Sequence, residues 1–338
     1  MKFGQAAMLS GVLLASCART PESVTPIGEH LRVESPLGLP PLERQPHKAA
    51  AALGEKLFSS PLLSVDGTRS CASCHRPVNG FAEEQRVSMG VGGKRGSRNA
   101  PTLLNAAFNR FQFHDGRAES LEAQAAGPIM NPIEMAHSES TLIEKLSADP
   151  AMLAMFREAY GEGPVTMGKI VGALAEFERT LLSGNSAFDR FVYGGDKSAL
   201  SESAQRGLEV FRDPAKGNCA ACHTIGEKYA LFTDQEFHNL GAGMTPQGEL
   251  GDLGRFAVTK QDGDQGKFRT PTLRNIALTA PYMHDGSLKD LREVVDFYVA
   301  GGNANPYLDP KMKPLQLTRR EKDDLIAFLE SLNGEAQP

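Results

Sequence analysis

The sequence contains no tryptophan, and aromatic residues make up only 7% of its 338 residues. It has five cysteines in all. It also lacks a run of basic residues, because the net charge of −5 comes from acidic and basic residues that are interspersed. This distribution excludes a nucleic-acid-binding surface and a polybasic lipid-headgroup patch. No segment reaches the roughly 20 apolar residues that span a bilayer, and only the N-terminus carries a shorter apolar stretch.

The alternating pattern of β-strands is also missing. Residues 168–182 and 319–332 instead carry apolar side chains at the i, i+3, i+4 spacing of a helix. Thr318 precedes the second segment and Glu321 follows three positions later, which predicts a capping box. We therefore predict a mostly α-helical protein.

Four of the five cysteines belong to two copies of one pattern, C-x-x-C-H. The residues are Cys71, Cys74 and His75 in the first copy, and Cys219, Cys222 and His223 in the second. In such a run the thiols bond to the vinyl groups of a heme and the histidine ligates its iron. A zinc site would need both cysteine pairs around one ion, and it would not explain a histidine after each pair. We therefore predict two covalently bound hemes c.

The fifth cysteine, Cys17, lies at the end of the apolar N-terminal stretch. The sequence L-A-S-C at this point resembles the lipobox of bacterial lipoproteins, and Lys2 precedes the stretch. We predict a lipoprotein signal peptide over residues 1–17. The alternative is an ordinary signal peptide with an incidental cysteine. Residues 18–45 are rich in proline and predict a tether. We expect a periplasmic protein that touches a bacterial membrane only through its N-terminal lipid.

After the tether the chain repeats itself. A helix-like stretch precedes each heme motif, at residues 52–58 and 205–211. Further on, A-P-T-L is followed by F-H-D-G in the first half, and T-P-T-L by M-H-D-G in the second, at a constant offset. A repeat of this kind indicates two copies of one structural unit. We predict two class-I cytochrome-c-like domains, over residues 46–200 and 201–334, with one heme c in each.

The order of the motifs resembles the bacterial di-heme cytochrome c peroxidase/MauG family. The motifs are CxxCH, N-A-P-T, F-x-D-G-R, Q-A-x-G-P-x-x-N-P-x-E-M, a second CxxCH, P-T-L-R-N and a final H-D-G. They cover the chain from about residue 50 to residue 333. The resemblance implies a di-heme c-type peroxidase. Such an enzyme reduces hydrogen peroxide at an open N-terminal heme, with electrons passed through the second heme.

The resemblance also assigns catalytic roles around the first heme. Glu134 corresponds to the acid–base group of the family, and Gln124 and Pro128 line the same pocket. Apolar neighbours flank Glu134, so we expect burial to raise its pKa. Many family members carry an iron-capping histidine in an S-x-G-H loop, but here the loop reads S-M-G-V at residues 88–91. We predict a five-coordinate first heme, with Met89 as the nearest alternative ligand.

The position between the two hemes departs from the family. Relatives usually carry tryptophan there as an electron relay, and this chain has His114. Imidazole is harder to oxidise than indole, so a relay through His114 is in doubt, and a hydrogen bond to a heme propionate is an equal alternative. Among the other histidines, His30, His47 and His137 are predicted to be surface or loop residues, and His238 and His284 to support propionates or packing near the second heme.

The repeat supplies a candidate sixth ligand for the second heme. Tyr298 follows His284 at the same separation as Pro128 follows His114. Proline has no donor atom, whereas tyrosine offers a phenolate that lowers the reduction potential of the iron. The family holds methionine or tyrosine at this position. The alternative ligands are Met283 and Met244.

The resemblance implies one calcium ion between the hemes, bound by the side-chain oxygen of Asn99, the carbonyls of Thr279 and Pro281, and waters. It implies as partners hydrogen peroxide and an electron-donor protein, a small c-type cytochrome or a cupredoxin, and it leaves a homodimer open. Two other functions stay open at this point. One is a MauG-type oxidant that modifies residues of a partner protein, and the other is a di-heme electron carrier, against which the retained pocket residues argue.

Overall fold

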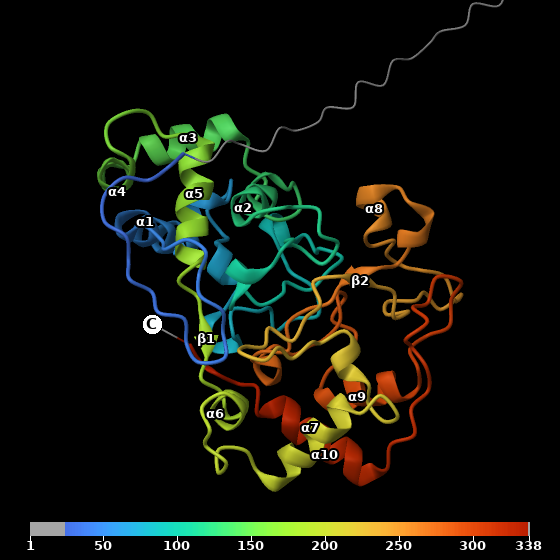
Figure 1. Cartoon of the computed structure of the whole chain (residues 1–338). Coiled ribbons are helices and arrows are strands. Elements are labelled where there is room, and N and C mark those ends of the chain that lie inside the picture. Colours follow the sequence, from blue (N-terminus) through green and yellow to red (C-terminus); the bar gives the residue numbers. More distant parts are fainter. Residues whose placement is uncertain (1–23, 337–338) are drawn as a thin grey trace, which may run out of the picture.

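The computed structural model describes residues 24–336. Its long elements are helices, which form a first group from α1 to α5 and a second group with α6, α7, α9 and α10 (Figure 1). The predicted mostly α-helical fold is confirmed. Cys17 and the proposed lipobox lie outside the described residues. The helices are α1 (Lys48–Ser59), α2 (Leu121–Met130), α3 (Glu139–Ser147), α4 (Pro150–Tyr160), α5 (Met167–Glu178), α6 (Ala187–Val192), α7 (Glu202–Arg212), α8 (Phe256–Thr259), α9 (Leu291–Val299) and α10 (Arg319–Glu330).

The strands of the described residues are two residues long and form two antiparallel pairs. β1 (Ser183–Gly184) pairs with β4 (Glu335–Ala336). β2 (Phe237–His238) pairs with β3 (Phe268–Arg269) in the loop-rich part of the second half. Helices and long loops therefore carry the fold, in agreement with the missing strand pattern.

One helix crossing is repeated in the two halves. α1 packs on α5, and α7 packs on α10. A Cβ atom on Gly54 would lie 1.9 Å from the carbonyl oxygen of Ala173, and one on Gly207 would lie 2.0 Å from that of Asp324. Only glycine permits backbones to approach this closely. The same residue type at the same crossing confirms the predicted repeat of two cytochrome-c-like domains.

The core of the second half begins earlier in the chain than the predicted boundary at residue 200. Phe188 of α6 is fully buried, and its ring centroid lies 5.0 Å from that of Phe232 and 5.9 Å from that of Phe328. Helix α6 therefore packs with the second half. Periodicity could not reveal this, because a helix of 6 residues is too short to show a pattern.

The described part of the proposed tether, residues 24–45, has no helix, but it is hydrogen-bonded to both halves of the protein. The amide of Ile27 donates to the carbonyl of Ala159 in the first half (2.8 Å). The carbonyl of Gly38 accepts from the amide of Ala230 in the second half (3.1 Å), and Leu39 is buried. This segment is thus part of the folded protein. Composition does not predict the result, because backbone groups of an extended segment can be satisfied by any neighbouring surface.

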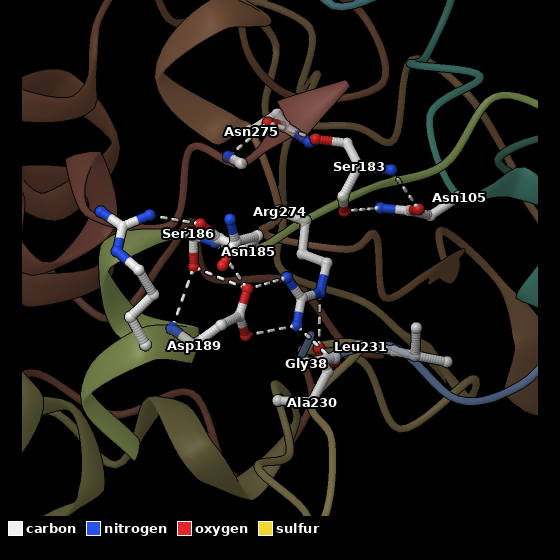
Figure 2. Close-up of polar contacts among 12 residues, drawn as sticks. Gly38, Asn105, Ser183, Asn185, Ser186, Asp189, Ala230, Leu231, Arg274 and Asn275 are labelled. Atoms are coloured by element: carbon white, nitrogen blue, oxygen red, sulfur yellow. Dashed lines mark hydrogen bonds and ion pairs between the residues drawn. The ribbon is translucent and has the colours of Figure 1, made fainter. Parts of the chain in front are cut away.

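A buried ion pair fixes this segment and α6 to the second half (Figure 2). Arg274 donates from its two terminal nitrogens to the carboxylate of Asp189, at 2.8 and 2.9 Å, and from Nε to the carbonyl of Ala230 at 2.7 Å. It also donates to the carbonyl of Gly38. Breaking such a fully paired, buried contact is expected to be strongly destabilising, because it leaves an unpaired charge.

The two helices predicted from periodicity are present as α5 and α10, and both end a few residues early, at Glu178 and Glu330. The predicted capping box is confirmed: Thr318 Oγ1 accepts from the amide of Glu321 (3.2 Å), and the Glu321 carboxylate accepts from the amide of Thr318 (2.7 Å). Within residues 24–336, no helix is both long enough and apolar enough to span a membrane.

Candidate active site

Each C-x-x-C-H motif starts with a short 3-10 turn, at Cys71–Ser73 and Cys219–Ala221. The Nδ1 atom of His75 lies 3.0 Å from the carbonyl oxygen of Phe81, and that of His223 lies 2.9 Å from the carbonyl oxygen of Phe232. A carbonyl only accepts, so Nδ1 carries the proton and Nε2 keeps its lone pair for a metal. Burial lowers the pKa of both imidazoles, which favours this neutral form. Both motifs therefore fit a heme iron.

A cavity surrounds the first motif. Residues from the heme motif, from α2 and from the turn after α2 line it together. The predicted residues among them are Cys71, Cys74, His75, Gln124, Pro128 and Glu134. The structure therefore brings the predicted peroxidatic residues to one place.

Glu134 is partly buried at the wall of this cavity. The side-chain amide of Asn131 donates to its Oε1 atom (2.7 Å). Burial raises the pKa of Glu134, as expected from the sequence, although the Asn131 hydrogen bond and the charge of Arg117 oppose the shift. The carboxyl group is thereby moved toward the range in which it can both hold and release a proton near neutral pH.

The loop at residues 88–91 contacts the same turn. The amide of Val91 donates to the carbonyl of Glu134 (2.8 Å), and the Val91 side chain is buried. Met89 lines the cavity and Val91 does not. Of this loop, Ser88, Met89 and Gly90 line the cavity, so Met89 stays the nearest alternative ligand.

Glu178 is a cavity residue that the sequence analysis missed. It lies at the end of α5, is 5% exposed, and its Oε2 atom has no hydrogen-bond partner among the described residues. Burial raises its pKa to about 8. The internal repeat was the signal in the sequence that could have identified Glu178. Because Phe177 packs at the crossing where Phe328 packs in the second half, Glu178 stands where that half has Leu329.

Tyr298 lies near the second motif. Its pKa is raised, first by burial and then by the thiols Cys219 and Cys222. Helices α2 and α9 begin at equivalent positions of the repeat, so Pro128 and Tyr298 occupy matching places on them. Of the alternative ligands, Met283 has a positive φ of 70° like its counterpart Phe113 at 65°, and Met244 forms an isolated bridge with Leu250.

Two family models match the chain in sequence order. The model described as "Di-haem cytochrome c peroxidase" matches residues 48–198, and a cytochrome c model matches residues 204–333. The methylamine utilization protein MauG of Methylorubrum extorquens is 42% identical over 84% of this chain and 78% of its own length. The cytochrome c peroxidase Ccp of Escherichia coli is 40% identical over 85% of this chain and 58% of its own length. The chain belongs to the di-haem cytochrome c peroxidase/MauG family.

Solved structures of similar proteins share the fold. A MauG-like protein associated with microbial copper homeostasis has a TM-score of 0.78 and 31% identity over 90% of this chain and 95% of its own. The diheme peroxidase BthA of Burkholderia thailandensis has a TM-score of 0.73 and 26% identity over 93% of this chain and 96% of its own. This protein is accordingly a di-heme c-type peroxidase, an oxidoreductase with two hemes c.

The halves of this family member meet through a reciprocal pair of backbone hydrogen bonds. The amide of Asn99 donates to the carbonyl of His284, and the amide of Arg269 donates to the carbonyl of His114, each at 2.8 Å. Asn99 and Arg269 hold equivalent positions in the repeat, just before the P-T-L segments. The interface is therefore locally symmetric in its backbone, although its side chains differ.

His114, at the family's relay position, is half-buried at this interface. Its Nε2 atom lies 3.0 Å from the carbonyl oxygen of Asn99. Burial lowers its pKa to about 4, and the nearby charges of His284, Arg98 and Arg269 act in the same direction. The ring is neutral at pH 7 with its proton on Nε2, so Nδ1 has no proton to donate to a propionate.

The candidate calcium ligands each have an oxygen atom that could bind a cation. The side-chain nitrogen of Asn99 donates to the carbonyls of Glu83 (3.2 Å) and Gln85 (2.8 Å), which leaves its oxygen as a free acceptor. The carbonyls of Thr279 and Pro281 accept no hydrogen bond from the described residues. Such oxygens are the donors that calcium prefers.

His30, His47 and His137, predicted as surface or loop residues, all lie outside the helices and named strands; His30 is exposed, whereas His47 and His137 are buried. The amide of His47 donates to the Glu176 carboxylate (2.6 Å) ahead of α1, a contact between residues too distant in sequence to be anticipated. His238 lies between Asp309 (2.6 Å) and Asp234 (2.9 Å) beside Cys222. His284 stacks on Phe268 at the interface of the halves, with ring centroids 3.7 Å apart.

Proposed function

We propose that the protein reduces hydrogen peroxide at its N-terminal heme with electrons that arrive through its C-terminal heme. The observation that carries this proposal is the common cavity of Glu134, Gln124 and Pro128 around the first heme motif. The net reaction is H₂O₂ plus two electrons and two protons to two waters. The heme held by Cys71, Cys74 and His75 supplies the iron at which peroxide is reduced.

Glu134 supplies the proton chemistry of this reaction. Because Asn131 donates to Oε1, the proton of the neutral acid resides on Oε2. A carboxyl group with a raised pKa can take a proton from one peroxide oxygen and return it to the other as the O–O bond breaks. Pro128 faces the cavity without a donor atom, and the side-chain amide of Gln124 can hydrogen-bond the substrate.

With Val91 at the family's histidine position, residues 88–91 offer no histidine to the iron of a heme bound here, and such a heme would need no prior reduction. The loop residue at the family's histidine position, Val91, is buried away from the cavity and cannot ligate iron. Stopped-flow mixing of the fully oxidised protein with hydrogen peroxide tests this. Rapid spectral change of the oxidised protein is expected. Reaction of only the half-reduced protein would instead identify Met89, which lines the cavity, as a ligand to be displaced.

A second candidate function is oxidation of a partner protein, as in MauG-type enzymes. Val91 and Tyr298 favour it, and His114 at the relay position weighs against it. The two functions differ in where the electrons come from. A peroxidase consumes peroxide in proportion to a reduced c-type cytochrome or cupredoxin, whereas a MauG-type enzyme consumes it with the oxidation of side chains on the partner, which mass spectrometry detects.

The proposal has two further parts, a lipid anchor at the N-terminus and a calcium ion at the interface of the halves. A lipid on Cys17 anchors the protein in the periplasm, and a calcium ion bound by Asn99, Thr279 and Pro281 lies between the hemes. Labelling with a radioactive fatty acid tests the first point, with Cys17→Ser as the unlabelled control. Loss of turnover on chelation, restored by calcium but not by magnesium, tests the second.

A further inference from the structure

Arg269 has a guanidinium group that pairs with no carboxylate within residues 24–336. Its Nη1 atom donates to the side-chain oxygen of Asn109 (3.2 Å) and to the carbonyl of Thr270 (3.3 Å). Its Nε atom is buried and has no hydrogen-bond partner among the described residues. Burial lowers the pKa of Arg269 to about 10, and no neighbouring carboxylate counteracts the shift.

Two other arginines, the buried Arg274 and the half-buried Arg98, show how the guanidinium charge is paired elsewhere in this protein. Arg274 forms a two-pronged pair with Asp189 (Figure 2). Arg98 donates to both Asp115 (2.6 Å) and Asp252 (2.7 and 2.9 Å). A desolvated cation is costly unless it is paired. Arg269 therefore has the character of a site whose anion comes from outside the polypeptide.

The position of Arg269 indicates which anion this is. It immediately precedes Thr270, and in the first half the residue equivalent to Thr270 is Ala100, which lines the heme cavity. Arg269 therefore lies at the corresponding edge of the second heme site, on the side that faces the first half. The anionic groups that every heme carries are its two propionates, and the forked guanidinium matches a carboxylate.

His114, another polar side chain at this interface, cannot take the same role. His114 already uses its one proton in the contact with the carbonyl of Asn99. A neutral Nδ1 accepts hydrogen bonds and would face a propionate with a lone pair. The Nε–H group of Arg269, by contrast, meets no acceptor among the residues that the structure describes.

We propose that Arg269 binds a propionate of the C-terminal heme and holds that carboxylate at the interface of the two halves. The backbone amide of Arg269 bonds to His114 in the first half, so the same residue joins the propionate to the opposite domain. Its positive charge beside the second heme favours the reduced iron. Arg269 is in this sense a positioning residue for electron passage between the hemes.

Spectroelectrochemical titration of the holoprotein tests the proposal. Arg269→Gln should lower the midpoint potential of the His223 heme and shift that of the His75 heme less. Arg269→Lys should keep most of the potential, because it keeps the charge. Arg255→Gln is the matched control, since Arg255 carries the same charge at the same interface but donates to the carbonyls of Asp115 and Gly116.

A second readout identifies the anion directly. In protein with ¹³C-labelled heme propionates, the redox-difference infrared spectrum should show a carboxylate band that moves in Arg269→Gln and in Arg269→Lys but not in Arg255→Gln. The proposal is overturned by an unchanged band, by equal potential shifts in the Arg269 and Arg255 variants, or by a larger shift at the His75 heme. If Arg269→Gln does not retain both hemes, the propionate carboxylate band of Arg269→Lys tests the proposal in its place.

Discussion

Helix α2 in the first half and helix α9 in the second half start at equivalent positions of the repeat, Leu121 and Leu291, yet they carry Pro128 and Tyr298 at the matching place. Proline has nothing to offer an iron atom, and tyrosine has a phenol. The backbone of the two halves is alike, so the proposed difference between an open first heme site and a closed second one rests on this one pair of side chains.

The same contrast recurs at two further pairs. Glu178 lines the first cavity where the second half has Leu329, and Asn99 stands where the second half has Arg269. Each pair changes charge or polarity without changing the helix crossing or the reciprocal backbone contact. A duplicated scaffold thus keeps its geometry while point differences give its two sites different chemistry.

The largest expected effect concerns the proton chemistry of the first half. Glu134→Gln keeps the size and the hydrogen bond to Asn131 but removes the titratable proton, so peroxide turnover should fall by roughly 100-fold or more. Steady-state assays on protein with both hemes in place measure this. Glu139→Gln, on an exposed residue, should leave turnover unchanged. Equal turnover in the two variants would refute Glu134 as the acid–base group.

The next prediction makes the second half more like a methionine-ligated cytochrome. Tyr298→Met should raise the reduction potential of the second heme and produce the near-infrared band of a His/Met ferric heme, because a thioether replaces an anionic phenolate. Tyr229→Met makes the same exchange on an exposed residue and should show neither change. A wild-type protein that already has this band would point to Met283 or Met244 as ligand.

A third prediction asks whether the helix crossings are equivalent. Gly54→Ala and Gly207→Ala each place a Cβ about 2 Å from a carbonyl oxygen, and each should lower the free energy of unfolding by roughly 1–3 kcal/mol or more. Denaturant titration of both variants measures the loss. Gly263→Ala, where a Cβ meets nothing within 4 Å, is the control. A large loss in one half alone would break the equivalence.

The smallest effect concerns Glu178 and is visible in how the free energy of unfolding depends on pH. The folded protein holds the Glu178 proton up to a pKa of about 8, whereas the unfolded chain releases it near 4.5. Stability of the wild-type protein should therefore fall as pH rises from about 4.5 to 8. Glu178→Leu, the residue of the second half, should remove this part of the slope and stabilise the protein by roughly 1–3 kcal/mol near neutral pH.

Denaturation at several pH values measures the change. Leu329→Glu, the reverse exchange in the second half, should lower the free energy of unfolding near neutral pH. An unchanged slope in Glu178→Leu would mean that the Glu178 carboxyl group has a partner in the heme-loaded protein.

Local signals predicted much of this molecule. The heme motifs, the helices α5 and α10 and the Thr318 cap could be predicted because neighbouring residues specify them. The sequence did not reveal the packing of residues 24–45, the placement of α6 or the burial of His47 and His137. These depend on contacts with residues that are distant in the sequence, for which a single chain carries no local pattern.

For the site, the sequence alone determined the chemistry available: two C-x-x-C-H motifs, and a carboxylate, a proline and a tyrosine at positions that the family resemblance assigns to the two heme sites. Tertiary structure decided the pKa values and hydrogen-bond partners of these groups. Burial raises the pKa of Glu134 and of Glu178, and a single carbonyl fixes the tautomer of His114. At the same interface Arg269 has no carboxylate partner in the part of the chain that the structure describes. The physical reason is that residue identity sets which groups can donate, accept or titrate, whereas desolvation and partner geometry exist only once the two halves have packed together.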